Sequence, residues 1–452
     1  MNIIIAGSGT VGKTLTEQLT AEGHNLTLID KNGATLRELL EKFDVMTAEG
    51  NCASMVTLED AGIKDADLLI ATTDSDELNL LCCMTAHQLN KRLHTIARIK
   101  TPEYAEQVYK MSAAFGISFC FNPEKQAATE IDRLLKYPGF MKRDSFAKGK
   151  VEIVELKIDE TSNLKDVKLM SIGSIVKCKI LVCAVLRDGK AVAPSGTFTL
   201  RQGDRVFVTA PSENLSVLLK NLGMVSWKPK KIMMVGCGAV GYYLAQILQN
   251  RHVDLTIVEK DQARCEKVSA LLPRATVIEG DAGNYEFLES EGLSSCDALV
   301  CTTGRDELNM ITSLYGGNSG VPLVITKLGK IDGTKVTENI SLGRVVSPRR
   351  LCCNTIVRYV RAMQNQQGAA LTIHSIADGN AEAIEFPVEA DTLYQGVPLK
   401  DIKLKPNVLI ACITRCGKTE IPDGNSSFGQ GDTLVVVSGR DRVLLALNDI
   451  FA

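Results

Sequence analysis

Residues 7–12 read Gly-Ser-Gly-Thr-Val-Gly, and residues 236–241 repeat the pattern as Gly-Cys-Gly-Ala-Val-Gly. Each copy lies between an apolar run, at 2–6 and 231–235, and a helical pattern, at 13–22 and 242–251. A strand, a glycine turn and a helix in this order form the context of a dinucleotide-binding fingerprint. The duplicated stretch therefore predicts two parallel α/β domains, each with an anion site at the start of its first helix.

The three glycines of each copy have different predicted roles. The first makes the tight turn, the second lets the backbone approach a pyrophosphate, and the third lets the helix pack closely on the strand. A glycine turn that only packs a helix on a sheet is the alternative, and a duplicated domain can keep its fold after losing its ligand. The predicted phosphate-binding residues are Gly7, Ser8, Gly9, Thr10, Val11, Gly12, Gly236, Cys237, Gly238, Ala239 and Val240.

An acidic residue ends the second apolar run of each half. Asp30 and Glu259 stand at the same distance from the first glycine of their copies. A carboxylate at this strand end accepts hydrogen bonds from ribose hydroxyls and repels a 2′-phosphate. The predicted ligands are therefore NAD(H), ATP or ADP rather than NADP.

The repeat continues beyond the glycines and adds candidate residues at other strand ends. Residues 71–79, Ala-Thr-Thr-Asp-Ser-Asp-Glu-Leu-Asn, return at 301–309 as Cys-Thr-Thr-Gly-Arg-Asp-Glu-Leu-Asn. Alternating strands and helices predict doubly wound parallel sheets, which bind ligands beyond the carboxyl ends of their strands. An ordinary strand-end ion pair is the alternative role for Arg98. In the second half, Lys327 stands near the position of Arg98, and Gly304 stands at the position of Asp74. The candidate residues at these ends are Asn51, Thr73, Asp74, Arg98, Asp281 and Thr303.

A proline-started amphipathic helix follows each α/β unit, at 123–137 and 348–363. Such a helix either covers its own core or crosses to a neighbour. Polar bridges at 142–150 and 364–368 lead to strand-rich segments, in which helical starts are predicted at 169–175 and 393–399. The predicted domains are 1–122 (Rossmann-like), 123–141 (crossover helix), 142–226 (small α+β), 229–347 (Rossmann-like), 348–366 (crossover helix) and 367–452 (small α+β).

Composition excludes several classes of protein. The net charge of −2 and the lack of a long basic run argue against a nucleic-acid partner, and Arg349-Arg350 is predicted to be a solvated helix start. Neither a signal peptide nor an apolar run long enough to span a membrane is expected, which predicts a cytosolic protein. Most of the cysteines fall inside apolar runs without metal or redox spacing, so we expect no disulfide framework and no metal site.

The order and duplication of these motifs resemble the RCK (regulator of potassium conductance, or KTN) family along essentially the whole chain. The glycine fingerprint, the strand-end acid, the Thr-Thr-x-x-Asp-Glu-x-Asn loop and a later Gly-Asp before a last strand carry the resemblance. It implies a non-enzymatic subunit that binds adenine nucleotides, NAD(H) or ATP/ADP, in its Rossmann-like domains. It also implies a homo-oligomer, a tetramer with a ring of eight such domains, on the cytoplasmic side of an integral-membrane Trk-type potassium channel subunit.

Two other functions use similar domains. A nicotinamide-dependent dehydrogenase shares the fingerprint but needs an acid or base over the nicotinamide, and the small domains contain one histidine between them and no candidate proton shuttle. The chain is therefore predicted not to be an enzyme. A regulator of another cation transporter or antiporter remains the closer alternative.

Overall fold

The chain divides into two compact units, and each unit takes residues from both sequence repeats. The computed structural model describes residues 1–112, 114–136, 138, 142–146, 150–160, 162–222, 228–331, 340, 342–364, 372–377, 380–439, 444 and 446–452. The parallel unit contains Met1–Asp132 and Pro229–Val357, and the antiparallel unit contains Arg133–Lys228 and Arg358–Ala452. Residue 227, between the predicted domains 142–226 and 229–347, and the predicted crossover ends at 141 and 366 lie outside the described residues.

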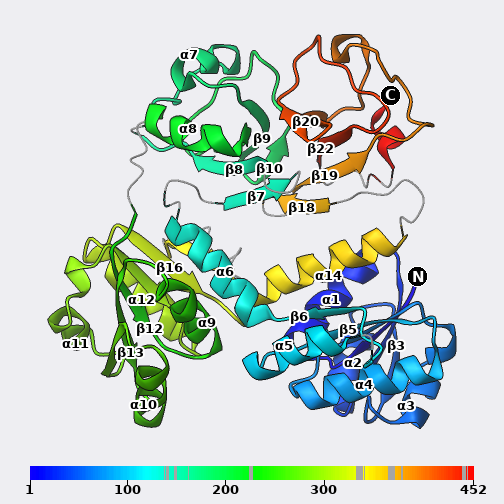
Figure 1. Cartoon of the computed structure of the whole chain (residues 1–452), viewed down its shortest axis with the longest axis vertical. Coiled ribbons are helices and arrows are strands. Elements are labelled where there is room, and N and C mark those ends of the chain that lie inside the picture. Colours follow the sequence, from blue (N-terminus) through cyan, green and yellow to red (C-terminus); the bar gives the residue numbers. More distant parts are fainter. Residues whose placement is uncertain are drawn as a thin grey trace. The chain divides into compact units, whose positions relative to one another are not determined.

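The first half of the parallel unit is a six-stranded parallel sheet in the order β3-β2-β1-β4-β5-β6, flanked by helices (Figure 1). This order confirms the predicted doubly wound fold, because the chain first adds strands on one side of β1 and then on the other. Its strands are β1 Asn2–Ala6, β2 Asn25–Asp30, β3 Met46–Glu49, β4 Leu68–Ala71, β5 His94–Arg98 and β6 Phe119–Phe121. Its helices are α1 Thr10–Ala21, α2 Gly33–Leu40, α3 Met55–Asp60, η1 Ile63–Asp65, α4 Asp76–Leu89 and α5 Pro102–Met111.

The second half of this unit repeats the arrangement in the order β14-β13-β12-β15-β16-β17. The duplication seen in the sequence is therefore a duplication of fold. Its strands are β12 Lys231–Val235, β13 Asp254–Glu259, β14 Ala275–Glu279, β15 Ala298–Cys301, β16 Leu323–Lys327 and β17 Arg344–Val346. Its helices are α9 Ala239–Leu248, α10 Gln262–Leu271, α11 Tyr285–Ser290, η5 Leu293–Ser295 and α12 Asp306–Asn318.

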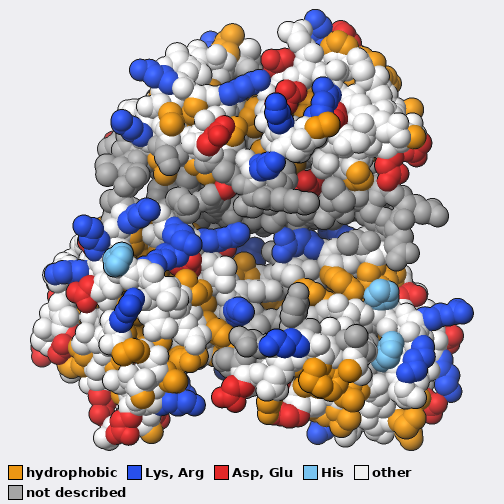
Figure 2. Space-filling view, in the orientation of Figure 1, with side chains coloured by type: hydrophobic (Ala, Val, Ile, Leu, Met, Phe, Trp, Pro, Cys, Tyr) orange, Lys and Arg blue, Asp and Glu red, His pale blue; other side chains and the backbone are white. Residues whose placement is uncertain are grey.

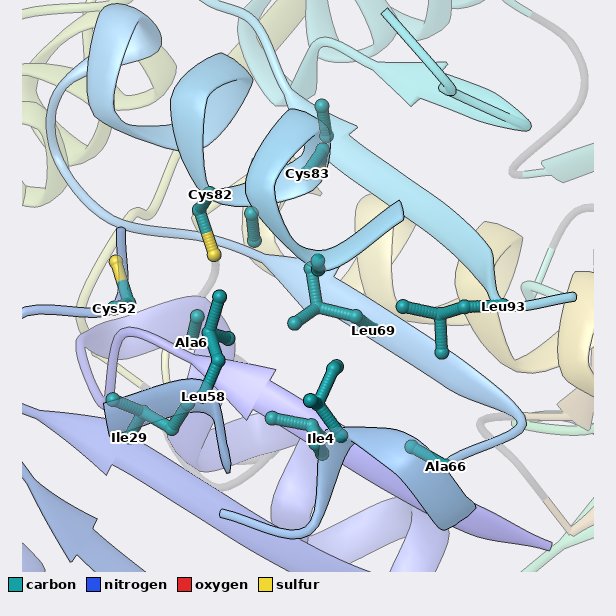
Figure 3. Packing of buried hydrophobic residues seen from close by; sticks show 14 of the residues in the cluster. Ile4, Ala6, Ile29, Cys52, Leu58, Ala66, Leu69, Cys82, Cys83 and Leu93 are labelled. Carbon is teal, nitrogen blue, oxygen red and sulfur yellow. The ribbon is translucent and has the colours of Figure 1, made fainter. Parts of the chain in front are cut away.

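The central strands are apolar on both faces because helices cover both sides of the sheet. All four residues of β4 are buried, and so are the last four of β1. One face packs Ile4 and Leu69 against small residues of α4, including Cys82 (Figure 3). This packing places the carboxyl ends of the strands, and the loops that follow them, at one edge of the sheet.

The two crossover helices are α6 Pro123–Lys136 and α14 Pro348–Gln364, close to the predicted ranges. They and the residues beside them connect the two α/β domains. In α14, Cys353 Sγ donates to the carbonyl of Val11 at 3.8 Å. The hydroxyl of Tyr243 accepts from Asn122 Nδ2 at 3.0 Å and donates to the carbonyl of Lys100 at 3.1 Å. The domains of the parallel unit therefore share side-chain contacts.

The antiparallel unit contains two five-stranded sheets, in the orders β10-β9-β11-β8-β7 and β18-β19-β22-β20-β21. A buried cluster draws on both sheets and includes Phe146, Phe207, Ile376 and Val437. The strands are β7 Lys142–Phe146, β8 Val151–Lys157, β9 Leu181–Arg187, β10 Lys190–Val192, β11 Arg205–Pro211, β18 Thr372–Ile376, β19 Ala381–Pro387, β20 Val408–Arg415, β21 Lys418–Glu420 and β22 Thr433–Gly439. The short helices are η3 Leu169–Ser171, α7 Ile172–Val176, η4 Ser212–Asn214, α8 Leu215–Asn221, η7 Leu399–Asp401 and η8 Leu447–Ile450.

The Gly-Asp motif of each small domain holds a turn. Asp204, which is buried, accepts from Arg187 Nε and Nη2 at 2.7 and 2.6 Å. Asp432 accepts from the matching arginine, Arg415, at 3.0 and 2.8 Å. Such bidentate pairs fix the geometry of both partners. The motif is therefore structural.

Two predictions about these domains were wrong. Residues 142–146 were expected to be part of a polar bridge but form the edge strand β7, because β8 pairs with them and Phe146 is buried in the shared cluster. A helical start was expected at 393–399, yet Tyr394 and Gly396 have φ of 59° and 74°, which a right-handed helix excludes. Only η7 begins there, at Leu399. Of the second predicted bridge, residues 365–368 lie outside the described residues.

Candidate functional site

The first glycine turn has the geometry that its three glycines predict. Gly7 has a φ of 99°, and a Cβ there would lie 2.8 Å from the backbone nitrogen of Thr73. A Cβ on Gly12 would lie 2.0 Å from the carbonyl oxygen of Gly7, so α1 packs directly on the turn. A Cβ on Gly9 would meet no atom within 4 Å, which leaves room for a ligand at the helix N-terminus.

The second glycine turn has the same geometry. Gly236 has a φ of 86°, and a Cβ on Gly241 would lie 2.6 Å from the Gly236 carbonyl oxygen. A Cβ on Gly238 would again meet nothing within 4 Å. The backbone of the second half has therefore kept the shape of the turn.

The strand-end acids stabilise these turns by accepting hydrogen bonds from their backbone nitrogens. Asp30 accepts from the backbone nitrogens of Ser8 and Asn32 at 2.6 and 2.9 Å. Glu259 accepts in the same way from the backbone nitrogen of Cys237 at 2.7 Å. Each carboxylate has further lone pairs beyond these bonds. An acid here therefore supports the turn and keeps acceptor capacity for a ribose hydroxyl.

The Thr-Thr-x-x-Asp-Glu-x-Asn loop contains a connecting residue to which sequence reasoning assigned no role. Asn79, fully buried in α4, accepts from the backbone nitrogen of Thr73 at 2.9 Å and donates to the carbonyls of Thr73 and Arg98 at 3.2 and 3.0 Å. It thereby ties the ends of β4 and β5 together. Asn309 makes the same bonds to Thr303 and Lys327. The recurrence of this asparagine in both loops was the available signal.

The aspartate of the Thr-Thr-x-x-Asp-Glu-x-Asn loop accepts hydrogen bonds from the loop that follows the next strand of the sheet. Asp306 accepts from the backbone nitrogens of Gly329, Lys330 and Ile331 at 2.6–3.0 Å. Burial opposes its ionisation, but these hydrogen bonds prevail and lower the pKa of Asp306. Asp76 holds the first-half loop in the same manner. These carboxylates hold the loops at the edge of each sheet, and Asp306 also lines the cavity described below.

Arg98 lies at the end of β5 between two carboxylates. Its guanidinium is 3.2 Å from Glu124 and 3.7 Å from Asp74, so the strand-end ion pair considered from the sequence is present. Its buried Nε atom, however, has no hydrogen-bond partner among the described residues, and neither has the hydroxyl of Ser8. Buried polar groups are normally paired, so these two atoms are left without the partner that such groups usually have.

A cavity of about 550 Å³ joins these groups to the second domain. From the second domain come Lys327, Lys330 and Arg349. The predicted residues that line the cavity are Gly7, Ser8, Gly9, Thr10, Val11, Asp30, Thr73, Asp74, Arg98 and Val240. The predicted residues that do not line it are Gly12, Asn51, Gly236, Cys237, Gly238, Ala239, Glu259, Asp281 and Thr303. The structure therefore brings the first glycine turn to the strand ends of the second sheet.

The cations from the second domain are partly withdrawn from water. Lys327 Nζ donates to the carbonyl of Thr303 at 2.8 Å, and burial lowers the pKa of Lys327. Arg349 Nε is buried without a partner in the described structure. The sequence predicted a solvated helix start at Arg349-Arg350; both residues are half-buried, and Arg349 lines the cavity. Partly buried cations favour an anionic ligand.

Two predicted residues serve their own loops instead. The Asn51 side chain accepts from the backbone nitrogen of Ala53 at 3.2 Å. Asp281 accepts from Lys260 Nζ at 2.8 Å and from the backbone nitrogen of Gly283 at 2.9 Å, which lower the pKa of Asp281. Both positions follow the third strand of their sheet and stabilise the turn there.

Other site types are not found in the described part of the chain. All fourteen cysteines are free thiols. Among the residues that the structure describes, no cluster of histidine, cysteine and carboxylate side chains is arranged to hold a metal ion. Over the same residues, no helix combines the length and the apolar character that crossing a bilayer requires.

Two Rossmann-like domains that alternate with two small antiparallel domains define a tandem RCK-type protein. Residues 3–119 and 232–348 match the TrkA-N domain, and residues 153–223 match the TrkA-C domain. The chain therefore belongs to the TrkA family.

Full-length relatives and solved structures agree with this assignment. The Trk system potassium uptake protein TrkA of Vibrio alginolyticus is 30% identical over 443 residues, covering 96% of this chain and 95% of that protein. A TrkA homolog of Archaeoglobus fulgidus is 29% identical, covering 98% of both chains. The fold is similar to the GsuK RCK domain (TM-score 0.63, 16% identity, 97% and 92% coverage) and to a GsuK channel bound to NAD (TM-score 0.63, 17% identity, 97% and 77% coverage).

Proposed function

We propose that this chain is a nucleotide-sensing regulatory subunit of a potassium uptake system. It binds an adenine nucleotide, NAD(H) or ATP/ADP, and gates a membrane Trk-type potassium channel or transporter. The observation that carries the proposal is the cavity beside the first glycine turn, in which Asp30, Arg98 and cations of the second domain meet. A solved GsuK channel holds NAD and another GsuK structure holds ADP, which supports this class of ligand.

The nucleotide would lie across the carboxyl edge of the first sheet. Its phosphates bind at the N-terminus of α1, beside Gly9, where the backbone is open. The ribose hydroxyls bind Asp30, and the phosphate tail extends toward Arg98 and Arg349. The unpaired Nε atoms of both arginines are the available donors. The predicted residues of the second half that do not line this cavity would form a separate site at the second glycine turn.

Gating follows from a ligand that contacts two domains at once. A nucleotide shifts an equilibrium between two arrangements only when it binds one of them more tightly. The cavity of this chain takes its wall from both domains of the parallel unit, so ligand contacts depend on how those domains pack. A coupling of about 1–3 kcal/mol between nucleotide and channel is the usual size for such regulation.

Self-assembly of this subunit has a candidate surface. Hydrophobic side chains lie exposed on the first domain (Figure 2), among them Met55 and Val56 of α3 and Leu81 of α4. Exposed apolar patches of this kind mark protein–protein contacts. We propose a homo-oligomer, a tetramer that places eight Rossmann-like domains in a ring on the cytoplasmic face of its channel partner.

The alternative functions lead to different observations. A dehydrogenase would oxidise or reduce a nicotinamide, and we propose that this chain is not an enzyme. A regulator of another cation transporter or antiporter would bind the same nucleotides without affecting Trk-type potassium uptake.

The test is binding of NADH, NAD, ATP and ADP by calorimetry, with the size of the assembly measured on the same samples. Asp30→Ala and Glu259→Ala form a matched pair, because each acid supports one glycine turn through the same backbone bond. Loss of tight binding in Asp30→Ala alone would make the first half the sensor, and separate losses would show two sensors. Wild-type protein that binds none of the four would refute the proposal.

Arg349→Gln tests the part of the site that belongs to the second domain. We expect it to weaken ATP and ADP at least tenfold, about 1.4 kcal/mol, because a desolvated cation beside the phosphate tail is lost. Arg350→Gln is the control, since its neighbour Arg349 lines the cavity and Arg350 does not. Equal affinities for both variants would exclude a phosphate contact from Arg349.

A further inference from the structure

Two cysteines of the first domain lie against each other, and the second domain has neither. Cys52 follows β3 and Cys82 lies in α4, and both belong to the buried cluster on one face of the first sheet (Figure 3). Figure 3 shows their sulfur atoms pointing into the same space, and each thiol affects the pKa of the other. The corresponding residues of the second domain are Ala282 and Thr312, where the Thr312 hydroxyl donates to the Ala282 carbonyl at 3.5 Å. The thiol pair is therefore specific to one half of the duplicated fold.

The two thiols differ in access. Cys52 lines the nucleotide cavity and is 4% exposed, whereas Cys82 is completely buried behind it. The adjacent Cys83 donates to the carbonyl of Ile96 at 3.7 Å. A reagent small enough to enter the cavity would meet Cys52 first and would find Cys82 as its neighbour.

The surroundings of the pair favour the thiolate of Cys52. The interaction with the Cys82 thiol, and to a smaller extent the charge of Lys31, lower the pKa of Cys52 against the opposing effects of burial and the charge of Asp30. The same interaction together with burial raises the pKa of Cys82. Thiolates are the reactive form of cysteine, so Cys52 is the attacking group and Cys82 is the second thiol.

We propose that Cys52 and Cys82 are a redox modification site, which a peroxide converts reversibly into a disulfide in the wall of the nucleotide cavity. The Cys52 thiolate attacks one peroxide oxygen, breaks the O–O bond and becomes a sulfenic acid while the first water leaves. Cys82 then attacks that sulfur, the S–S bond forms, and the second water leaves. Two thiols thus lose two electrons and two protons to one peroxide, and a small thiol reverses the change by exchange.

The disulfide would act on the cavity wall. An S–S bond is about 2.05 Å long and holds the two Cβ atoms about 3.8 Å apart, so it fixes the loop that carries Cys52 to α4. That loop is joined to the end of β2, because the Gly50 backbone nitrogen donates to the carbonyl of Asp30 at 2.9 Å. Oxidation therefore restrains the wall beside the ribose position. This consequence rests on the proposed nucleotide site, whereas formation of the disulfide does not.

The experiment treats the full-length protein with hydrogen peroxide in the absence of nucleotide, blocks the remaining thiols by alkylation and maps linked peptides by mass spectrometry. The test variants are Cys52→Ala and Cys82→Thr, which install the residues that the second domain has at these positions. Cys83→Ala is the matched control, because Cys83 neighbours the pair and bonds elsewhere. The exposed Cys416 reports that the alkylating reagent reacts.

We expect a Cys52–Cys82 link in the wild type and in Cys83→Ala, and none in the two test variants. The proposal is overturned if Cys52 stays reduced, if it is oxidised further while Cys82 stays a thiol, or if Cys52 links to Cys83. Melting curves of the variants identify any loss of fold.

A second arm adds saturating ADP before the peroxide. Bound nucleotide covers Cys52 and should slow formation of the link at least tenfold. An unchanged rate with ADP bound by calorimetry would overturn the role of the cavity as the route to Cys52. A link that forms in protein unable to bind any nucleotide would instead refute the proposed function and leave the disulfide standing.

Discussion

Alanine substitutions at Gly12 and Gly9 of the first turn should have separate effects, the first on the stability of the fold and the second on nucleotide affinity. A Cβ on Gly12 would lie 2.0 Å from the Gly7 carbonyl oxygen, where ordinary contact begins at 3.4 Å, so α1 would have to retreat by the difference, roughly 1.4 Å. The Thr72 hydroxyl holds that carbonyl at 2.9 Å, and α1 packs through the fully buried Leu15. We expect Gly12→Ala to cost about 3 kcal/mol, as overpacking does.

Gly9→Ala should have the opposite effect. The backbone at Gly9 (φ −69°, ψ −166°) suits alanine, and the new methyl group meets no atom of the protein within 4 Å. Stability should therefore change by less than about 0.5 kcal/mol. The methyl group would occupy the space that a pyrophosphate needs, so nucleotide affinity should fall at least tenfold, about 1.4 kcal/mol.

The assay for this pair is thermal unfolding together with calorimetric titration of ADP. For Gly12→Ala we expect Tm to fall by about 6–12 °C, at about 2–4 °C per kcal/mol for a unit of this size. For Gly9→Ala we expect an unchanged Tm and weak binding. If Gly9→Ala bound ADP as tightly as the wild type, or if Gly12→Ala melted at the wild-type temperature, the geometric reasoning would be refuted.

Two further changes test the framework around the cavity. Tyr243→Phe removes the hydroxyl that bonds to the first domain and should cost about 1–2 kcal/mol in urea unfolding. Tyr242→Phe, whose hydroxyl bonds within its own helix, should cost little, and equal losses would contradict the assigned contact. The folded-state pKa of Asp306 lies below its ordinary 3.8, so its stabilisation is complete above about pH 4 and is lost as the pH falls. Asp306→Asn should therefore lower stability at pH 7 and flatten its decline on acidification, and an unchanged pH profile would count against this account.

The sequence predicted most of the parallel unit because its signals are local. The glycine turns, the strand-end acids and the apolar runs depend on neighbouring residues, and both repeats carry them. The position of Lys327 and Arg349 in the same cavity as the first glycine turn could not be predicted, because it depends on how the two Rossmann-like domains pack. Strand β7 was missed because Lys142 to Ser145 are polar, and its pairing with β8 and the burial of Phe146 follow only from tertiary structure.

The buried cluster shared by the two antiparallel sheets has a consequence for how this chain evolves. In an assembly of identical subunits, every substitution appears on both sides of an interface at once. Here the two halves are covalently joined, so a mutation changes one side alone while the shared core keeps the halves together. Glu124 and Arg349, which follow the prolines that begin the two crossover helices, have taken opposite charges in the wall of one cavity. Covalent linkage of the two copies thus allows matching positions to diverge, as Glu124 and Arg349 have done.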